Sequence, residues 1–252
     1  MKVIISGCGG KMGTALFELI NNDGTHEVVA GIDRVPPKYY PQPVYLSFED
    51  CGVIADSIID FSRPEVLPSM LKYAVKNKIS VVAATTGLDS RDYKAMSEAA
   101  EFIPIFHSAN MSVGMNLLKT LVKKAAQTLA PGFDIEIIEK HHNQKADAPS
   151  GSALILAEAV NSVLENKKEY IYGRKGVSSK RDYDEIGIHA VRGGSIVGDH
   201  EVYFIGEQEI IELSHRTLSR SVFAAGALRA AEFIKDKKPG LYGMDDLIGM
   251  ML

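Results

Sequence analysis

The segment from residue 3 to residue 20 constrains the fold of this chain more than any other. The apolar run Val3-Ile4-Ile5 is typical of a short buried strand, and a glycine-rich turn follows it at once. After the turn, apolar residues recur at helical spacing, at Met12, Leu16, Leu19 and Ile20. A strand, a glycine turn and an amphipathic helix in this order are typical of the first unit of a doubly wound, dinucleotide-binding sheet.

The glycines Gly7, Gly10 and Gly13 fit the spacing G-x-x-G-x-x-G, whereas the commoner G-x-G-x-x-G spacing fails at Met12. Both spacings provide a tight turn whose backbone can approach a pyrophosphate at the start of a helix. Asp33 lies 20 residues after Gly13, at the end of the next apolar run, where a carboxylate accepts hydrogen bonds from ribose hydroxyls. We therefore predict dinucleotide binding, the alternative being a plain structural turn.

The pair Asp33-Arg34 bears on the choice of cofactor. A carboxylate repels a 2′-phosphate, whereas a guanidinium attracts one. The two side by side predict that both NADH and NADPH are used. The alternative for Arg34 is an ordinary solvated surface charge.

Further apolar runs predict strands at residues 27–33, 57–61, 80–84 and 102–106, with a helix after Pro64. Continuous apolar strands that alternate with helices imply a parallel sheet covered on both faces. The fold class predicted for this half is α/β, a doubly wound, Rossmann-like nucleotide domain.

The pattern changes after Asn110. A helix that ends near residue 129, a strand at 134–139 and a helix after Pro149 come first. Strands predicted at 186–191, 195–205 and 209–215 then form a meander, with turns at Gly193-Gly194 and Gly206-Glu207. This mixture predicts a second, α+β domain over residues 110–216. A helical tail at 221–234 is expected to pack back on the nucleotide domain, which then comprises residues 1–109 and 217–252.

Composition and charge exclude several functions. The chain has 252 residues, of which 46% are hydrophobic and 24% charged, as in ordinary globular proteins. A net charge of -4 gives no general attraction to nucleic acid or to anionic membranes. Cys8 and Cys51 lack the spacing of metal ligands and are read as apolar filling. No signal peptide and no run of about 18 apolar residues is present, so we expect a soluble, cytoplasmic protein.

The segment His141-His142-x-x-Lys145-x-Asp147-Ala148-Pro149-Ser150-Gly151-Ser152 carries the strongest chemical signal. Its second part opens a helix, and a helix amino terminus with hydroxyls and N–H groups suits a carboxylate. Histidine and lysine beside it add positive charge and proton donors. A histidine pair is also found in structural and metal sites, but no third ligand has suitable spacing, so no metal is predicted.

Two loops follow predicted strands, at the edge of the sheet where ligands bind. They are Ala84-Thr85-Thr86-Gly87 and Ser108-Ala109-Asn110-Met111. Their small and hydroxyl-bearing residues suit the lining of a nicotinamide site, although the same composition is typical of turns.

Taken together, these segments resemble the dihydrodipicolinate reductase family. The resemblance rests on the histidine–lysine segment, the glycine loop, both strand-end loops, Asp60-Phe61-Ser62-Arg63-Pro64 and Val197-Gly198-Asp199-His200. These matches run in one order through nearly the whole chain. The family reduces 4-hydroxy-tetrahydrodipicolinate, with loss of water, to tetrahydrodipicolinate on the route to lysine and diaminopimelate, and it is usually a homotetramer.

The resemblance also implies roles for residues. His141 would donate and accept the proton, Lys145 would be a second proton donor, and His142, Gly151 and Ser152 would bind the substrate. The second domain would bind substrate and mediate oligomerisation. The residues implied for the cofactor are Gly7, Cys8, Gly9, Gly10, Lys11, Met12, Asp33, Arg34, Ala84, Thr85, Thr86, Ser108, Ala109, Asn110 and Met111.

The chain departs from the family pattern at four positions. Cys8 stands where alanine is expected, Ala84 where glycine is expected, Ser152 replaces threonine and Met111 replaces an aromatic residue. The change at Ala84 bears most on backbone contacts to nicotinamide.

Two rival functions remain at this point. A module that senses dinucleotide without turnover would need no proton donor beside a carboxylate site, and His141 and Lys145 argue against it. A different NAD(P)-dependent dehydrogenase of dicarboxylates is compatible with Pro149-Ser150-Gly151-Ser152, because any carboxylate can bind there.

Overall fold

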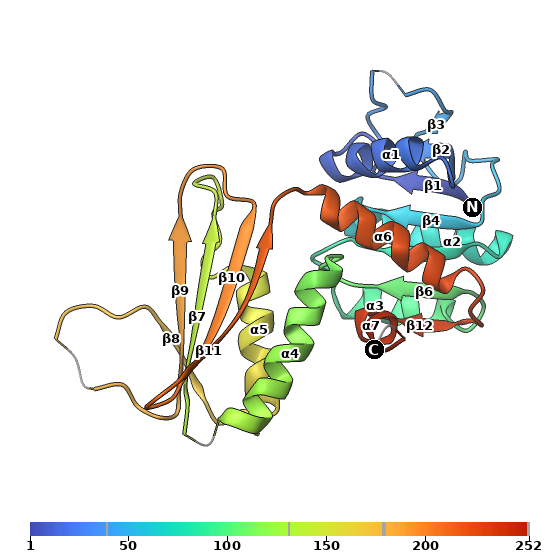
Figure 1. Ribbon diagram of the computed structural model, residues 1–252. Coiled ribbons are helices and arrows are strands. Elements are labelled where there is room, and N and C mark those ends of the chain that lie inside the picture. The colour runs from blue at the N-terminus through green and yellow to red at the C-terminus, as the bar shows by residue number, and fades with distance from the viewer. Residues whose placement is uncertain (39, 131, 178–179, 251–252) are drawn as a thin grey trace. The chain divides into compact units, whose positions relative to one another are not determined.

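The computed structural model describes residues 1–38, 40–130, 132–177 and 180–250 and divides into two compact units. The first unit comprises Met1–Val113 and Arg220–Leu252, and the second comprises Gly114–Ser219. Figure 1 shows the helices and strands of both.

The first unit is built on a parallel sheet of seven strands in the order β12-β6-β5-β4-β1-β2-β3. The strands are β1 (Lys2–Ser6), β2 (Glu27–Ile32), β3 (Val44–Tyr45), β4 (Ser57–Asp60), β5 (Ser80–Ala83), β6 (Pro104–His107) and β12 (Gly240–Tyr242). The chain proceeds outward from β1 in both directions, so the crevice beside the carboxyl end of β1 is the position where such sheets bind ligands.

Helices cover both faces of this sheet (Figure 1). They are α1 (Lys11–Asp23), α2 (Leu67–Asn77), α3 (Ser90–Ala99), α6 (Ser221–Ile234) and α7 (Met244–Gly249), with a short 3-10 helix η1 (Pro64–Val66) before α2. Val3 and Ile5 of β1 pack in one core with α1, α6 and α7, whereas Ile4 packs in the other with α2 and α3. The predicted doubly wound fold and the return of the helical tail to this unit are therefore confirmed.

The second unit is a five-stranded sheet in the order β11-β10-β7-β9-β8. Its strands are β7 (Asp134–His141), β8 (Glu169–Tyr172), β9 (Glu185–Arg192), β10 (Gly198–Ile205) and β11 (Ile210–Thr217). The helices α4 (Val113–Leu129) and α5 (Gly151–Ser162) bury their apolar residues against one face of this sheet. Alternate residues of β7 point to that buried face, namely Ile135, Ile137, Glu139 and His141.

The predicted meander is correct for one turn and wrong for the other. Strands β10 and β11 form an antiparallel hairpin, closed by a 2.9 Å hydrogen bond from the Gly206 N–H to the Glu209 carbonyl. Strands β9 and β10 do not pair, because β7 lies between them, parallel to β9 and antiparallel to β10. The Gly193-Gly194 turn passes over the end of β7, where the Gly193 N–H donates to the His141 carbonyl (2.9 Å) and the Asn143 N–H to the Gly194 carbonyl (3.2 Å).

No helix within the described ranges is long and apolar enough to cross a membrane.

Candidate active site

The glycine loop of the first unit is shaped by close approaches of its backbone. Gly7 has a φ of +77°, and a Cβ there would lie 2.9 Å from the carbonyl group of Phe61. A Cβ on Gly13, inside α1, would lie 2.2 Å from the Gly7 carbonyl oxygen. Gly10 is the N-cap of α1 and has no capping side chain. The loop therefore keeps the helix start open to a ligand, as the spacing of the glycines predicts.

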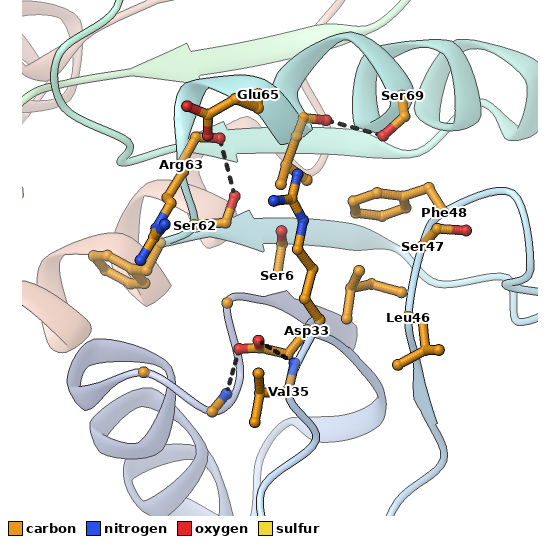
Figure 2. A pocket seen from close by; sticks show the side chains of 17 residues that line it. Ser6, Asp33, Val35, Leu46, Ser47, Phe48, Ser62, Arg63, Glu65 and Ser69 are labelled. Atoms are coloured by element: carbon orange, nitrogen blue, oxygen red, sulfur yellow. Dashed lines mark hydrogen bonds between the residues drawn. The ribbon is translucent and has the colours of Figure 1, made fainter.

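Asp33 lies directly after β2, beside the glycine loop. Its Oδ2 accepts a hydrogen bond from the Gly9 N–H at 2.9 Å, and its Oδ1 accepts one from the Val35 N–H at 3.1 Å (Figure 2). Because each carboxylate oxygen has a second lone pair, both oxygens can still accept from a ligand. Asp33 thereby fixes one edge of a cavity of about 570 Å³, into which Gly9, Gly10, Arg34 and Arg63 also face.

A second cavity of about 450 Å³ lies at the same edge of this unit, and Phe61 and Ser62 border both cavities. The structure brings both predicted strand-end loops to it, together with the start of α1. Its lining includes Lys11, Met12, Ala84, Thr85, Thr86, Ala109, Asn110 and Met111, with Arg220 and Phe223 from the carboxyl-terminal segment.

Two of the predicted cofactor residues stand apart from these linings. The Ser108 side chain bonds within its own loop: its Oγ donates to the Asn110 carbonyl (2.8 Å) and accepts from the Asn110 N–H (3.3 Å). The side chain of Cys8 is packed in the core, where burial and then the charge of Asp33 raise its pKa to about 11. Any contact of Cys8 with a dinucleotide must come from its backbone.

Asp60, a buried acid at the end of β4, organises the loops of the second cavity. Its Oδ2 accepts from the Thr85 hydroxyl at 2.5 Å, and its Oδ1 accepts from the N–H and the hydroxyl of Ser62. The Ala84 N–H donates to the Asp60 carbonyl at 2.9 Å, so the backbone at this position continues the pairing of β4 with β5. Asp60 was included in a sequence motif without a role, because its contact with Thr85 joins the ends of two different strands.

In the second unit, His141 is the last residue of β7 and is almost wholly buried. Its Nδ1 lies 2.6 Å from Oε2 of Glu139, whose side chain is inaccessible to solvent. Arg192, at the end of β9, donates from both terminal nitrogens to the two Glu139 oxygens, at 2.7 and 2.8 Å. The Ser150 N–H donates to Oε1 at 3.0 Å.

These contacts determine the charge of Glu139. Burial alone would raise the pKa of this carboxyl, but hydrogen bonds from Arg192, His141 and the Ser150 N–H outweigh burial and hold that pKa below its usual value. Glu139 is therefore an anion at neutral pH, and an anionic carboxylate only accepts hydrogen bonds. It follows that His141 carries a hydrogen on Nδ1.

His200 of β10 packs edge-to-face against His141, with ring centroids 5.2 Å apart. Its Nε2 lies 3.3 Å from the Ser150 Oγ, and its buried Nδ1 has no hydrogen-bond partner among the residues that the structure describes. Burial and then the charge of His141 lower the pKa of His200 to about 4, so this ring is neutral near pH 7. Two buried imidazoles therefore lie side by side, one bonded to the Glu139 carboxylate and the other to the Ser150 hydroxyl.

The remaining predicted residues lie around this pair. Ser150 caps α5 by accepting from the Ala153 N–H at 3.2 Å, and Gly151 and Ser152 form the first turn of that helix, as predicted. Lys145 forms an ion pair with Asp147 at 2.9 Å, and its hydrogen bond lowers the pKa of Asp147. The Lys145 N–H donates to the His142 carbonyl at 3.2 Å, so the loop folds back on itself.

Glu139 and Arg192 were missed in the sequence, and His200 was noted in a motif without a role. Glu139 was recoverable, because a residue two positions before His141 on a strand shares its face. Arg192 is the register partner of His141, and His200 that of Glu139, across two different neighbouring strands. A register between strands so distant in sequence is not readable from a local pattern. In the ranges the structure describes, no group of three or more histidine, cysteine or acidic side chains is arranged to hold a metal ion.

Comparisons with known proteins agree over the whole chain. Residues 1–111 match the family model described as dihydrodipicolinate reductase, N-terminus, and residues 114–248 match the one described as dihydrodipicolinate reductase, C-terminus. The 4-hydroxy-tetrahydrodipicolinate reductase of Caldanaerobacter subterraneus subsp. tengcongensis is 52% identical over 250 residues, 98% of each chain. That of Clostridium novyi is 48% identical, again over 98% of each chain.

Solved structures give the same result at the level of the fold. A dipicolinate-bound dihydrodipicolinate reductase from Paenisporosarcina sp. TG-14 matches with a TM-score of 0.83 and 26% identity, covering 98% of each chain. Aspartate dehydrogenase from Thermotoga maritima matches with a TM-score of 0.52 and 14% identity, covering 94% of this chain and 97% of that one, which shows a shared fold alone.

Proposed function

Because this chain belongs to the dihydrodipicolinate reductase family, whose members are pyridine-nucleotide-dependent oxidoreductases, we propose that it reduces 4-hydroxy-tetrahydrodipicolinate to tetrahydrodipicolinate with His141 and Lys145 as proton donors. The family places this reaction in the biosynthesis of lysine and diaminopimelate. The observation that carries the assignment of roles is the buried His141–Glu139 pair beside the amino terminus of α5, where Ser150 is the N-cap.

We assign dinucleotide binding to the first unit and substrate binding to the second. The open start of α1 and the carboxylate of Asp33 fit a pyrophosphate and a ribose, and the second cavity offers the Thr85-Thr86 and Ala109–Met111 backbones to a nicotinamide. When bound there, NADH or NADPH would supply the hydride. This chain's residues have to orient the acceptor ring and deliver the proton.

The second unit provides the groups for proton delivery and anchoring. Negative charge that develops on the ring during reduction must be quenched by a positioned acid, and His141 is held for this purpose by Glu139. The N–H groups of Gly151 and Ser152 at the first turn of α5, with the positive charge of Lys145, suit one substrate carboxylate. His142 lies in the same loop and is assigned to the substrate as well.

The decisive experiment is turnover coupled to the preceding pathway enzyme, followed by the loss of reduced-nicotinamide absorbance. His141→Ala and Lys145→Ala should each lower kcat by about 10²–10⁴-fold, the usual contribution of a general acid. NADH affinity should stay unchanged, because neither residue lies in the first unit. If His141→Ala kept a normal kcat, the role would pass to His142.

Substrate recognition gives a test against the rival dehydrogenase function. Pyridine-2,6-dicarboxylate should bind in calorimetric titrations with NADH present, and a pyridine monocarboxylate should bind far more weakly, because one set of charge-assisted contacts is missing. Ser152→Ala should weaken the dicarboxylate only modestly, since backbone N–H groups remain at the helix start. Equal affinity for both compounds would defeat the proposed dicarboxylate pocket and favour the rival dehydrogenase.

We propose further that both NADH and NADPH are used, because Asp33 suits a ribose hydroxyl while Arg34 and Arg63 bring positive charge to the same cavity. Asp33→Ala should weaken NADH by about 1.5–3 kcal/mol and NADPH by less. Equal losses for the two cofactors would mean that Asp33 does not contact the ribose.

We also propose that the protein acts in the cytoplasm as a homotetramer assembled through the second unit. The family resemblance supports this, as do the exposed side chains of Val191 and Ile210 on the sheet of that unit. Native mass spectrometry tests the assembly, and a monomer at micromolar concentration would contradict it.

A further inference from the structure

The Glu139 carboxylate is saturated with hydrogen-bond donors. Oε2 accepts from His141 Nδ1 and from one terminal nitrogen of Arg192, and Oε1 accepts from the other terminal nitrogen and from the Ser150 N–H. Four donors for two oxygens occupy all the lone-pair sites of a carboxylate. The side chain is fully buried, so solvent does not compete for these partners.

His141 is confined on its other side as well. A Cβ on Gly198 would lie 2.9 Å from His141 Nε2, so a side chain at this position of β10 would press on the ring. The His200 ring lies edge-to-face at 5.2 Å. With Nδ1 bonded to Glu139, Nε2 is the nitrogen left to exchange a proton.

We propose that Glu139 is the positioning residue of the reductase: it fixes the tautomer and orientation of His141 so that Nε2 faces the substrate, and it stabilises the imidazolium that donates the proton. This inference rests on the proposed function of His141. It deepens that proposal because it names the group that makes a buried imidazole a competent acid.

The charges that face His141 come from several elements. Glu139 lies on its own strand, Arg192 on β9 and His200 on β10, while Lys145 and Asp147 lie on the loop that follows. Arg192 also donates to the Asp147 carbonyl at 2.7 Å, which ties that loop to the same carboxylate. Arg192 therefore keeps Glu139 ionised and reduces the negative charge that reaches the imidazole.

A purely structural role for Glu139, as the counter-ion of a half-buried arginine, makes different predictions from a positioning role. In the structural case, removing both charges restores activity, whereas in the positioning case activity stays low. The variants Glu139→Gln and Glu139→Gln/Arg192→Gln separate the two, because the second leaves no unpaired guanidinium.

Glu136 offers a matched control on the same strand. It lies three residues earlier and is likewise held by Arg174 and Arg181 and by a histidine, His189, at 2.8 Å. Glu136→Gln therefore removes an equally well-bonded carboxylate that does not contact His141. Its kcat should equal that of the wild type once size-exclusion chromatography shows the same assembly.

The test measures steady-state kinetics over a range of pH. Glu139→Gln and the double variant should both lower kcat by about 10²-fold, within the span of a positioned acid, while the affinity for pyridine-2,6-dicarboxylate is unchanged. The alkaline limb of the kcat profile should move to lower pH, because a neutral amide no longer stabilises the protonated ring. Adding Glu139→Gln to His141→Ala should cause no further loss, since Glu139 acts through His141.

The outcomes separate the inference from the proposed function. If the wild type shows no turnover, or His141→Ala is fully active, the proposed function fails. If His141→Ala is impaired while Glu139→Gln or the double variant keeps normal kcat and pH dependence, the inference is overturned and the function stands. Should the variants not fold, ¹⁵N shifts of His141 in the labelled wild type decide: a neutral ring protonated on Nε2 would refute the inference.

Discussion

Acidification should destabilise this protein through one buried ring, His200. The ring is almost wholly buried in the sheet of the second unit, where Nε2 contacts Ser150 and Nδ1 has no hydrogen-bond partner within the described part of the chain. Burial and the neighbouring charge of His141 lower its pKa from 6.5 to about 4. Between these two values His200 is protonated in the unfolded chain and neutral in the folded state.

The size and the pH range of the effect follow from linkage. The contribution of His200 to stability is fully present above pH 6.5, is lost as the pH falls toward 4, and levels off below that. The gap between 6.5 and about 4 corresponds to about 3 kcal/mol, at about 1.4 kcal/mol per unit. Between pH 7 and pH 5 the unfolded state gains about 2 kcal/mol of this.

Urea unfolding of the wild type and of His200→Gln at pH 7 and pH 5 tests this expectation. Protonation of carboxylates with lowered pKa values, such as Glu139 and Glu136, also destabilises the folded state on acidification, but it does so in both proteins. The informative quantity is thus the difference between the two losses, which should be about 2 kcal/mol smaller in the variant. Equal losses would refute the argument and mean that His200 is solvated or paired in solution.

Three further predictions concern close contacts of the backbone and a helix cap. Gly226→Ala in α6 places a Cβ 1.7 Å from the Met111 carbonyl oxygen. The variant should lose about 1–3 kcal/mol of stability in urea unfolding and bind NADH more weakly in fluorescence titrations. Unchanged stability and affinity would contradict this packing. Gly198→Ala should displace the His141 ring and lower kcat with little effect on NADH affinity, and a fully active variant would show that the ring has room to move. Ser150→Ala removes the cap of α5 and should cost about 1 kcal/mol by thermal unfolding, an effect whose absence would show that the helix start is held by its other contacts.

The fold was predictable wherever short-range pattern and function coincide. The continuous apolar runs at residues 57–61 and 80–84 placed β4 and β5 to within a residue, because strands buried on both faces carry no polar alternation. The hairpin between β9 and β10 was predicted wrongly, since the rule that neighbours in sequence pair in space does not see β7 inserted between them. Strands as short as Val44–Tyr45 and Gly240–Tyr242 carry no periodic signal at all.

Residues of the candidate site that share one segment could be grouped from the sequence, whereas those contributed by other strands could not. His141 and Ser150 lie within one local segment whose helix start is visible in the sequence. Arg192 and His200 reach Glu139 and His141 only through pairings of β7 with β9 and β10, which are set by long-range packing of the sheet. A local segment therefore shows which of its own residues lie close together, whereas contacts made by side chains of other strands depend on a register that the segment does not contain.

The buried face of β7 shows why the role of Glu139 was not recognised in the sequence. Ile135 and Ile137 obey the alternation of a strand under two helices, and the next two positions of that face are Glu139 and His141. Glu139 breaks this apolar pattern at a position where burying a carboxylate is costly. Hydrogen bonds from His141, Arg192 and the Ser150 N–H offset that cost. Well-packed apolar residues of similar volume in place of such a pair are often neutral or stabilising, so folding alone gives little reason to keep it. What the carboxylate does provide is a histidine with one fixed tautomer, which requires an anion at this position of the strand.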